Sequence, residues 1–155
     1  MISKTGDWTL FRDKLKSCTQ INQKAKDKLQ EDSKLVVEKI EGHIDRQDLS
    51  WASLSDSTTS QKGSNEIYVE TGALRNSFNV SKVKESSKEL TYHVGVPSNK
   101  VHTESGLTYN QLLEYMEFGT MTQPARPLIQ PTNREIQKEL KQDWVNFLKE
   151  EIGGR

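Results

Sequence analysis

The sequence has little that could crosslink the chain, anchor it in a membrane or attract a polyanion. Its 155 residues include one cysteine, Cys18, which excludes an internal disulfide and a cysteine-based zinc site. No apolar run approaches the ~18–20 residues that a membrane-spanning helix needs, and residues 1–8 lack the apolar core of a signal peptide. A soluble protein is therefore expected. Lys and Arg number 22, as do Asp and Glu, and this neutral balance argues against a dedicated nucleic-acid binder.

Large apolar residues are also scarce. Leu, Ile, Val and Phe make up about 23% of the chain, just above the ~20% below which a strongly charged chain stays disordered. We therefore expect one folded domain, residues 1–155, with a thin core. A compact monomer of this length buries about two-thirds of its unfolded surface. This chain is expected to complete its burial only against neighbouring subunits.

The N-terminal part of the sequence predicts two helices. Trp8, Phe11 and Leu15 recur at spacings of three and four, which predicts a short first helix with Asp7 as its N-cap. A longer amphipathic helix is expected to begin at Thr19, with charges of both signs on its exposed face. Its apolar positions are Ile21, Ala25, Leu29, Val36, Ile40 and Ile44.

Three further parts follow this helical part, which we place at residues 1–47. Residues 48–66 are rich in Ser and Thr and have no apolar period, so we expect a polar loop; such segments are usually functional or disordered. Residues 67–129 are expected to form a hairpin and helix core, and residues 130–153 a C-terminal helix with Pro131 in its first turn. This order indicates an α+β fold, in which N-terminal helices and a long C-terminal helix pack against a small antiparallel sheet.

Local signals place the elements of the central part. Strands are expected over residues 78–83 and 90–96, because apolar and polar residues alternate on both sides of a polar turn. Thr71 is a candidate N-cap for a helix of one or two turns. An apolar helix over 108–118 is expected to end at Gly119.

Three segments carry a resemblance to a known family. They are residues 51–55, 69–77 and 115–128, which read WASLS, VETGALRNS and YMEFGTMTQPARPL. In order and spacing they resemble the signatures W-x-x-L-S…T-G-x-L-x-x-S and E-x-G-T…P-A-R-P-F/L of the head–tail joining proteins of tailed bacteriophages. That family includes neck, tail-completion and minor tail proteins and the virion-morphogenesis proteins of Mu-like phages. Leu128 stands where Phe is common.

The resemblance implies a structural virion protein that forms a ring at the head–tail junction. Such a ring joins the portal–connector complex to the tail tube and lets DNA pass. Six copies, which we expect, would match the tail tube, whereas twelve would match the portal. The implied partners are other copies of the chain, the head-completion or connector proteins, and the tail tube or tail terminator. The implied location is the virion, after assembly in the host cytoplasm. A tail terminator that caps the tube and a minor tail protein are the alternatives.

The candidate contact residues lie in and near the loops. A closed ring needs one patch of each copy to meet a different patch of the next, and we expect the loops 48–66, 97–107 and 119–131 to supply it. Arg126 lies between two prolines, so it loses little entropy when it pairs with a carboxylate; a pair within the chain is the alternative for it and for Arg75. The predicted contact residues are Trp51, Leu54, Arg75, Arg126 and Pro127. Two glycines, Gly72 and Gly119, are expected at positive φ.

Chemical sites find little support in the sequence. Its three histidines have no zinc-site spacing, and no nucleophile elbow or phosphate-binding glycine loop is present. In residues 19–46 the lysines alternate with acids, which weakens attraction to a phosphate backbone. No catalytic residue, metal, cofactor or membrane contact is predicted, and an enzyme or a nucleic-acid module is a distant alternative.

Overall fold

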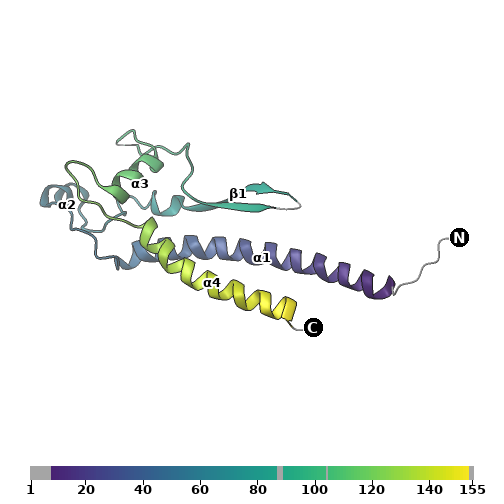
Figure 1. Ribbon diagram of the computed structural model, residues 1–155. Coiled ribbons are helices and arrows are strands. Elements are labelled where there is room, and N and C mark those ends of the chain that lie inside the picture. Colours follow the sequence, from purple (N-terminus) through teal and green to yellow (C-terminus); the bar gives the residue numbers. More distant parts are fainter. Residues whose placement is uncertain (1–7, 87–88, 104, 154–155) are drawn as a thin grey trace.

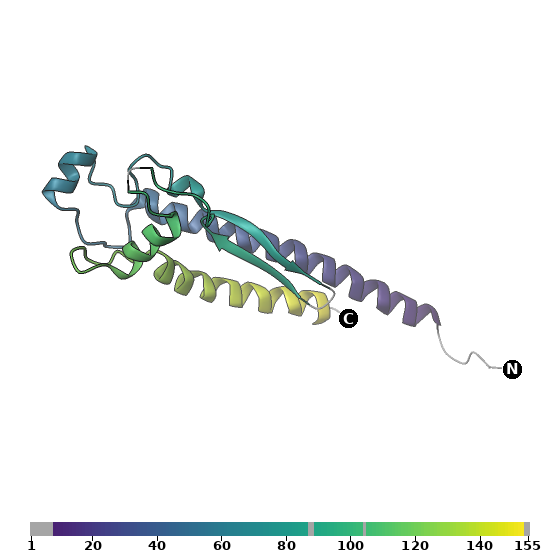
Figure 2. The ribbon, with the colours of Figure 1, turned by 90° about the horizontal axis from the view of Figure 1, so that it is seen from above.

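The structure, a computed structural model, describes residues 8–86, 89–103 and 105–153. Its elements, in chain order, are α1 (Trp8–Arg46), α2 (Asp56–Lys62), the 3-10 turn η1 (Arg75–Ser77), β1 (Asn79–Glu85), β2 (Leu90–Gly95), α3 (Tyr109–Phe118) and α4 (Ile129–Gly153). The molecule is elongated (Figures 1 and 2). The antiparallel helices α1 and α4 and the hairpin form a stem, and α2, α3 and the loops around them form a lobe at one end of it. The predicted α+β class is confirmed.

Helix α1 is a single helix of 39 residues, so the prediction of two N-terminal helices was wrong. The segment from Lys16 to Gln20, where the break was expected, contains neither glycine nor proline, and nothing else in it interrupts the helical hydrogen bonds. Thr19 is an exposed residue inside the helix and not an N-cap. Asp7 lies outside the described residues, as do the side chains of the predicted stripe on the first helix.

The β-hairpin was predicted correctly, with ends that differ by one or two residues. Asn79 pairs with Gly95 and Glu85 with Leu90, and a bulge interrupts the register between Lys82 and Lys84. The Glu85 carboxylate accepts hydrogen bonds from Lys82 Nζ at 2.7 Å and from Lys26 Nζ of α1 at 2.9 Å. These two ammonium groups lower the pKa of Glu85 to about 2, and the bond from Lys26 ties the hairpin to α1.

The polar loop contains a helix that its composition did not predict. Helix α2 begins after Ser55, whose side-chain oxygen accepts the Thr58 N–H, and it ends at Gly63 in the left-handed region. None of its residues is buried. The helix is therefore defined by its caps and not by an apolar stripe, which is why periodicity missed it.

The helix expected after Thr71 is only one 3-10 turn, so Thr71 is not the N-cap that we predicted. Its hydroxyl oxygen accepts a bond from the Ala73 N–H, and η1 follows Leu74 without a side-chain cap. Gly72 does adopt the expected positive φ, +74°. Strand β1 begins two residues after η1, which leaves no room for a second helical turn.

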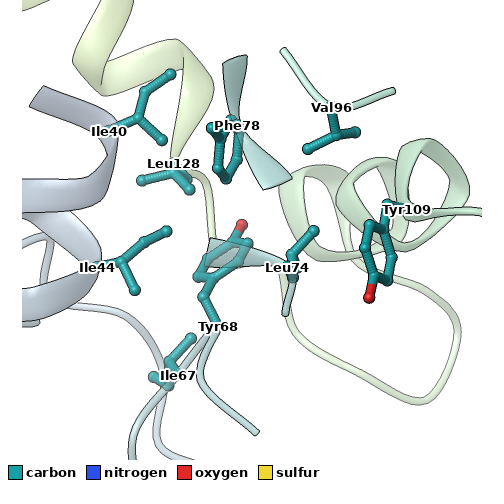
Figure 3. Packing of buried hydrophobic residues seen from close by; sticks show 9 residues of the cluster. All are labelled: Ile40, Ile44, Ile67, Tyr68, Leu74, Phe78, Val96, Tyr109 and Leu128. Atoms are coloured by element: carbon teal, nitrogen blue, oxygen red, sulfur yellow. The ribbon is translucent and has the colours of Figure 1, made fainter. Parts of the chain in front are cut away.

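The core lies where the stem meets the lobe (Figure 3). There Ile40 and Ile44 of α1 face Leu128, at the start of α4, and aromatic residues from the loops. The other buried members are Ile67, Tyr68, Leu74, Phe78, Val96 and Tyr109. Because the far half of α1 contributes no buried apolar residue among those described, the core is small for a chain of this length.

The chain exposes more surface than a compact protein of its mass. Its accessible area is 11124 Å², whereas a compact monomer of 17.7 kDa is expected to expose about 8000 Å². The exposed large apolar residues include Phe118 at 67% and Met121 at 104% of the reference area, both in the lobe. Burial of this excess against other subunits stays a prediction.

Polar contacts as well as apolar ones join α1 to α4. Lys39 Nζ donates to Glu135 at 2.7 Å and to Glu139 at 2.9 Å. Trp144 Nε1 donates to the carboxylate of Asp32 at 2.7 Å. Ion pairs and a hydrogen bond therefore join α1 to α4, and such ion pairs are individually weak when exposed.

We expect Ile44→Ala to lower the free energy of unfolding by about 2–5 kcal/mol, because Ile44 has no exposed area and its removal leaves a cavity. Val145→Ala is the matched control, since Val145 of α4 is 39% exposed and leaves no cavity. Urea titration followed by circular dichroism measures both variants. Equal losses in the two variants would contradict the placement of the core.

Candidate subunit-contact site in the lobe

Residues 51–55 and 115–128, the first and third segments of the resemblance, meet in the lobe. Trp51 Nε1 donates to the carbonyl oxygen of Pro127 at 2.6 Å. The guanidinium of Arg126 donates to the carbonyl oxygens of Ala52, from Nε at 2.7 Å, and Ser53, from Nη2 at 2.9 Å. Two segments more than seventy residues apart in sequence are thereby joined by three hydrogen bonds.

The second segment, residues 69–77, is attached to Arg126 through Tyr68, the residue directly before it. The Tyr68 hydroxyl donates to the carbonyl oxygen of Arg126 at 2.6 Å, and the Arg126 N–H donates to the carbonyl oxygen of Met116 at 2.7 Å. The Tyr68 ring also contacts Trp51, with ring centroids 5.1 Å apart. Trp51 therefore packs against a ring of its own subunit. Burial, reinforced by the nearby Glu117 carboxylate, raises the pKa of the Tyr68 phenol.

Glu117 of α3 caps the N-terminus of α4. Its carboxylate is buried and accepts the N–H groups of Leu128, Ile129 and Gln130 at 2.7, 2.9 and 2.8 Å. The N-terminus of a helix carries partial positive charge and unpaired N–H groups, so it stabilises an anion there. The sequence analysis placed Glu117 in the E-x-G-T signature but gave its side chain no role. The available signal was the absence of Ser, Thr, Asp or Asn immediately before α4, which left its cap to be supplied from elsewhere.

Gly119 makes the turn after α3 possible. Its φ is +76°, and a Cβ at this position would lie 2.8 Å from the Ala125 nitrogen and 2.9 Å from the Gln123 oxygen. Any other residue would be strained and would push the backbone of the turn apart. The predicted role of this glycine is confirmed, and the turn it permits brings Arg126 back against α3.

We call the bonded group of Trp51, Tyr68, Glu117, Arg126 and Pro127 the junction. Arg75 lies apart from the junction, on the side of α1. Its Nε and Nη2 donate to the two carboxylate oxygens of Asp45 at 2.8 and 2.6 Å, and Glu41 lies 3.6 Å away. The hydrogen bonds from Arg75 hold the pKa of the Asp45 carboxyl below its usual value. This bidentate pair fastens the turn after Gly72 to the long helix, as the intrachain alternative for Arg75 required.

A cavity of about 600 Å³ lies beside the junction. It is bounded by α2 and the residues before it, by residues 68–74, by α3 and by residues 122–126, and we call it the lobe cavity. Leu54 is half-buried in its wall. The apolar part of the lining also includes Leu74, Leu112 and Met116.

The lining of the lobe cavity includes two basic side chains, Arg126 and Lys62. Arg126 Nη1 has no hydrogen bond to any described residue, and Lys62 donates to the carbonyl oxygen of Glu66 at 2.6 Å. Burial lowers the pKa of Lys62. Glu70 is the acidic member of the lining, and His102 Nε2 lies 3.2 Å from its carboxylate.

Four of the five predicted contact residues lie together in the lobe, and the fifth lies elsewhere. Trp51, Arg126 and Pro127 belong to the junction, and Leu54 lines the adjacent cavity. Arg75 is tied to α1 instead. Each arginine side chain has partners within the chain, and contact of all five residues with a neighbouring copy stays a prediction.

The described ranges contain neither a group of metal-ligating side chains nor a helix able to span a membrane. Within residues 8–86, 89–103 and 105–153, no three His, Cys, Asp or Glu side chains are grouped so that they could hold a metal ion. In the same residues, no helix is long and apolar enough to cross a membrane. Comparison of the chain with known protein families, with curated proteins and with solved structures gives no match.

We expect Glu117→Gln to lower the free energy of unfolding by about 1–3 kcal/mol, because the amide loses the charge and one of its two acceptor atoms while buried N–H groups remain to be satisfied. Glu38→Gln, an exposed change on α1, is the control. Urea titration measures both. If Glu117→Gln unfolds at the same urea concentration as the control, the cap contributes nothing.

Alkaline pH tests the burial of Tyr68. Because its pKa is raised in the folded chain, the unfolded chain ionises first, near the ordinary value of 10.0. The stabilising contribution is complete below that pH and is lost as the pH rises above it. Wild-type unfolding free energy should therefore fall above pH 10 more steeply than that of Tyr68→Phe, measured by urea titration at a series of pH values. Parallel curves would show that Tyr68 ionises freely in the folded chain.

Proposed function

We propose that the chain is a structural virion protein that forms a closed ring at the head–tail junction of a tailed bacteriophage. The ring joins the portal–connector complex to the tail tube and leaves a passage for DNA. Six copies would match the symmetry of the tube. The proposal begins from the resemblance of residues 51–131 to the head–tail joining proteins and treats the role as assembly rather than catalysis.

The observation that carries the proposal is the physical connection between the motifs. Residues that are far apart in sequence but belong to the resemblance, such as Trp51, Glu117 and Arg126, are bonded to one another or to the same short turn. Gly119, another motif residue, permits that turn. A chance likeness of three short segments gives no reason for such convergence, whereas a common fold with common anchoring residues does.

The shape and surface of the chain also support assembly. The accessible area exceeds that of a compact monomer of the same mass by roughly 3000 Å². Stable interfaces bury about 800 Å² per partner, so each copy has surface for a neighbour on both sides. In a ring every copy has two neighbours, one through each of two different patches.

Genetic disruption tests the proposal. When the gene for this chain is inactivated in the genome that carries it, we expect electron microscopy of the particles to show DNA-filled heads and separate tails that are not joined. Expression of the wild-type chain from a plasmid should restore joined particles and serves as the control. Joined, infectious virions from the disrupted genome would refute the proposed role.

A further inference from the structure

Helix α3 has two chemically different faces. One face, with Leu112, Met116 and the capping carboxylate of Glu117, is directed into the chain, and the first two residues line the lobe cavity. The opposite face carries exposed residues at helical spacing. These are Gln111, Glu114, Tyr115 and Phe118.

The outer face is unusually apolar for a surface that is open to water. Tyr115 is 42% exposed and Phe118 is 67% exposed, and Met121 follows in the next turn with its side chain fully exposed. Together with Glu114 we call these residues the α3 plug. Single exposed apolar residues are ordinary, but a cluster of large ones marks a surface that binds another protein.

The plug carries one carboxylate, Glu114, and the lining of the lobe cavity carries two cations and one carboxylate. Glu114 is exposed and has no ion pair with any of the described residues. The cavity offers the unused Nη1 of Arg126 and the ammonium of Lys62, while its carboxylate, Glu70, is accompanied by His102. A carboxylate that enters the cavity beside apolar side chains would therefore find two cationic donors at an apolar wall.

We propose that the α3 plug of one copy docks into the lobe cavity of the next copy. The inference rests on the proposed ring and names its contact. Because plug and cavity lie on opposite sides of one helix, a copy that receives a neighbour on one side offers its own plug on the other. Such a contact is head-to-tail and closes into a ring when the rotation between copies divides a full turn.

Two variants block the two halves of the contact separately. Phe118→Asp places a charge in the plug and leaves the cavity intact, whereas Thr58→Trp fills the cavity and leaves the plug intact. Val83→Asp is the matched control, since Val83 is 65% exposed but lies in the hairpin, away from the lobe. Sedimentation velocity of the purified full chain over a range of concentrations measures the assembly of each.

The wild-type chain and Val83→Asp should form ring-sized oligomers, and each blocked variant should associate at least about tenfold more weakly. A one-to-one mixture of the two blocked variants should form heterodimers and nothing larger, because one intact plug meets one intact cavity. The heterodimer also shows that both variants are folded. A charge exchange adds a second readout: Glu114→Lys and Lys62→Glu should each weaken assembly, and the double variant should regain it.

Three results would overturn the inference. They are rings of Phe118→Asp as stable as those of the wild type, a mixture of blocked variants that stays monomeric, and a wild-type chain that stays monomeric at every concentration. The first of these leaves the proposed function intact, because rings still form by another contact. Failure of the proposed function is seen separately, in the particles made by the disrupted genome.

Discussion

The turn from Arg126 to Gln130 determines how the lobe and the stem are joined. Its backbone bonds to α3 and to Tyr68, the side chain of Arg126 bonds to the segment after Trp51, and its N–H groups bond to Glu117. Several of these groups are buried, so the loss of any one partner leaves a polar atom unpaired. Since α4 begins within this turn, the direction of the stem depends on the same few bonds.

This arrangement divides the polar groups of the lobe into two sets. Tyr68, Glu117 and the Nε and Nη2 atoms of Arg126 have hydrogen-bond partners within the chain, so these groups hold the lobe in shape. The outer face of α3 is exposed, and Arg126 Nη1 in the lobe cavity has no hydrogen bond to any described residue. Helix α3 thus separates an exposed apolar face from the lobe cavity. A lobe held in shape by its own hydrogen bonds is suited to repeated association, because little conformational entropy is lost when a neighbour binds.

The hairpin and α3 could be predicted, whereas α2, which only its caps define, and the contacts between residues distant in sequence could not. Thr108 and Gly119 define α3 locally, and alternation defines the hairpin. The cap of α4 comes from Glu117, eleven residues before Leu128, and the carbonyls bound by Arg126 lie more than seventy residues away. The three segments of the resemblance come together in the lobe. Their spacing alone could not say which residues bond within the chain and which remain free.

The balanced charge of the chain is seen in the stem as ion pairs between its elements. Some of its acids and bases are paired across elements, as in Lys39 with Glu135 and Lys26 with Glu85. Copies that stand side by side would repel one another if each carried a large net charge. A passage lined by such paired charges would also attract DNA weakly, because strong binding requires many unpaired cations along the phosphate backbone. In the proposed ring, pairing of this kind would serve both close packing of copies and free passage of DNA.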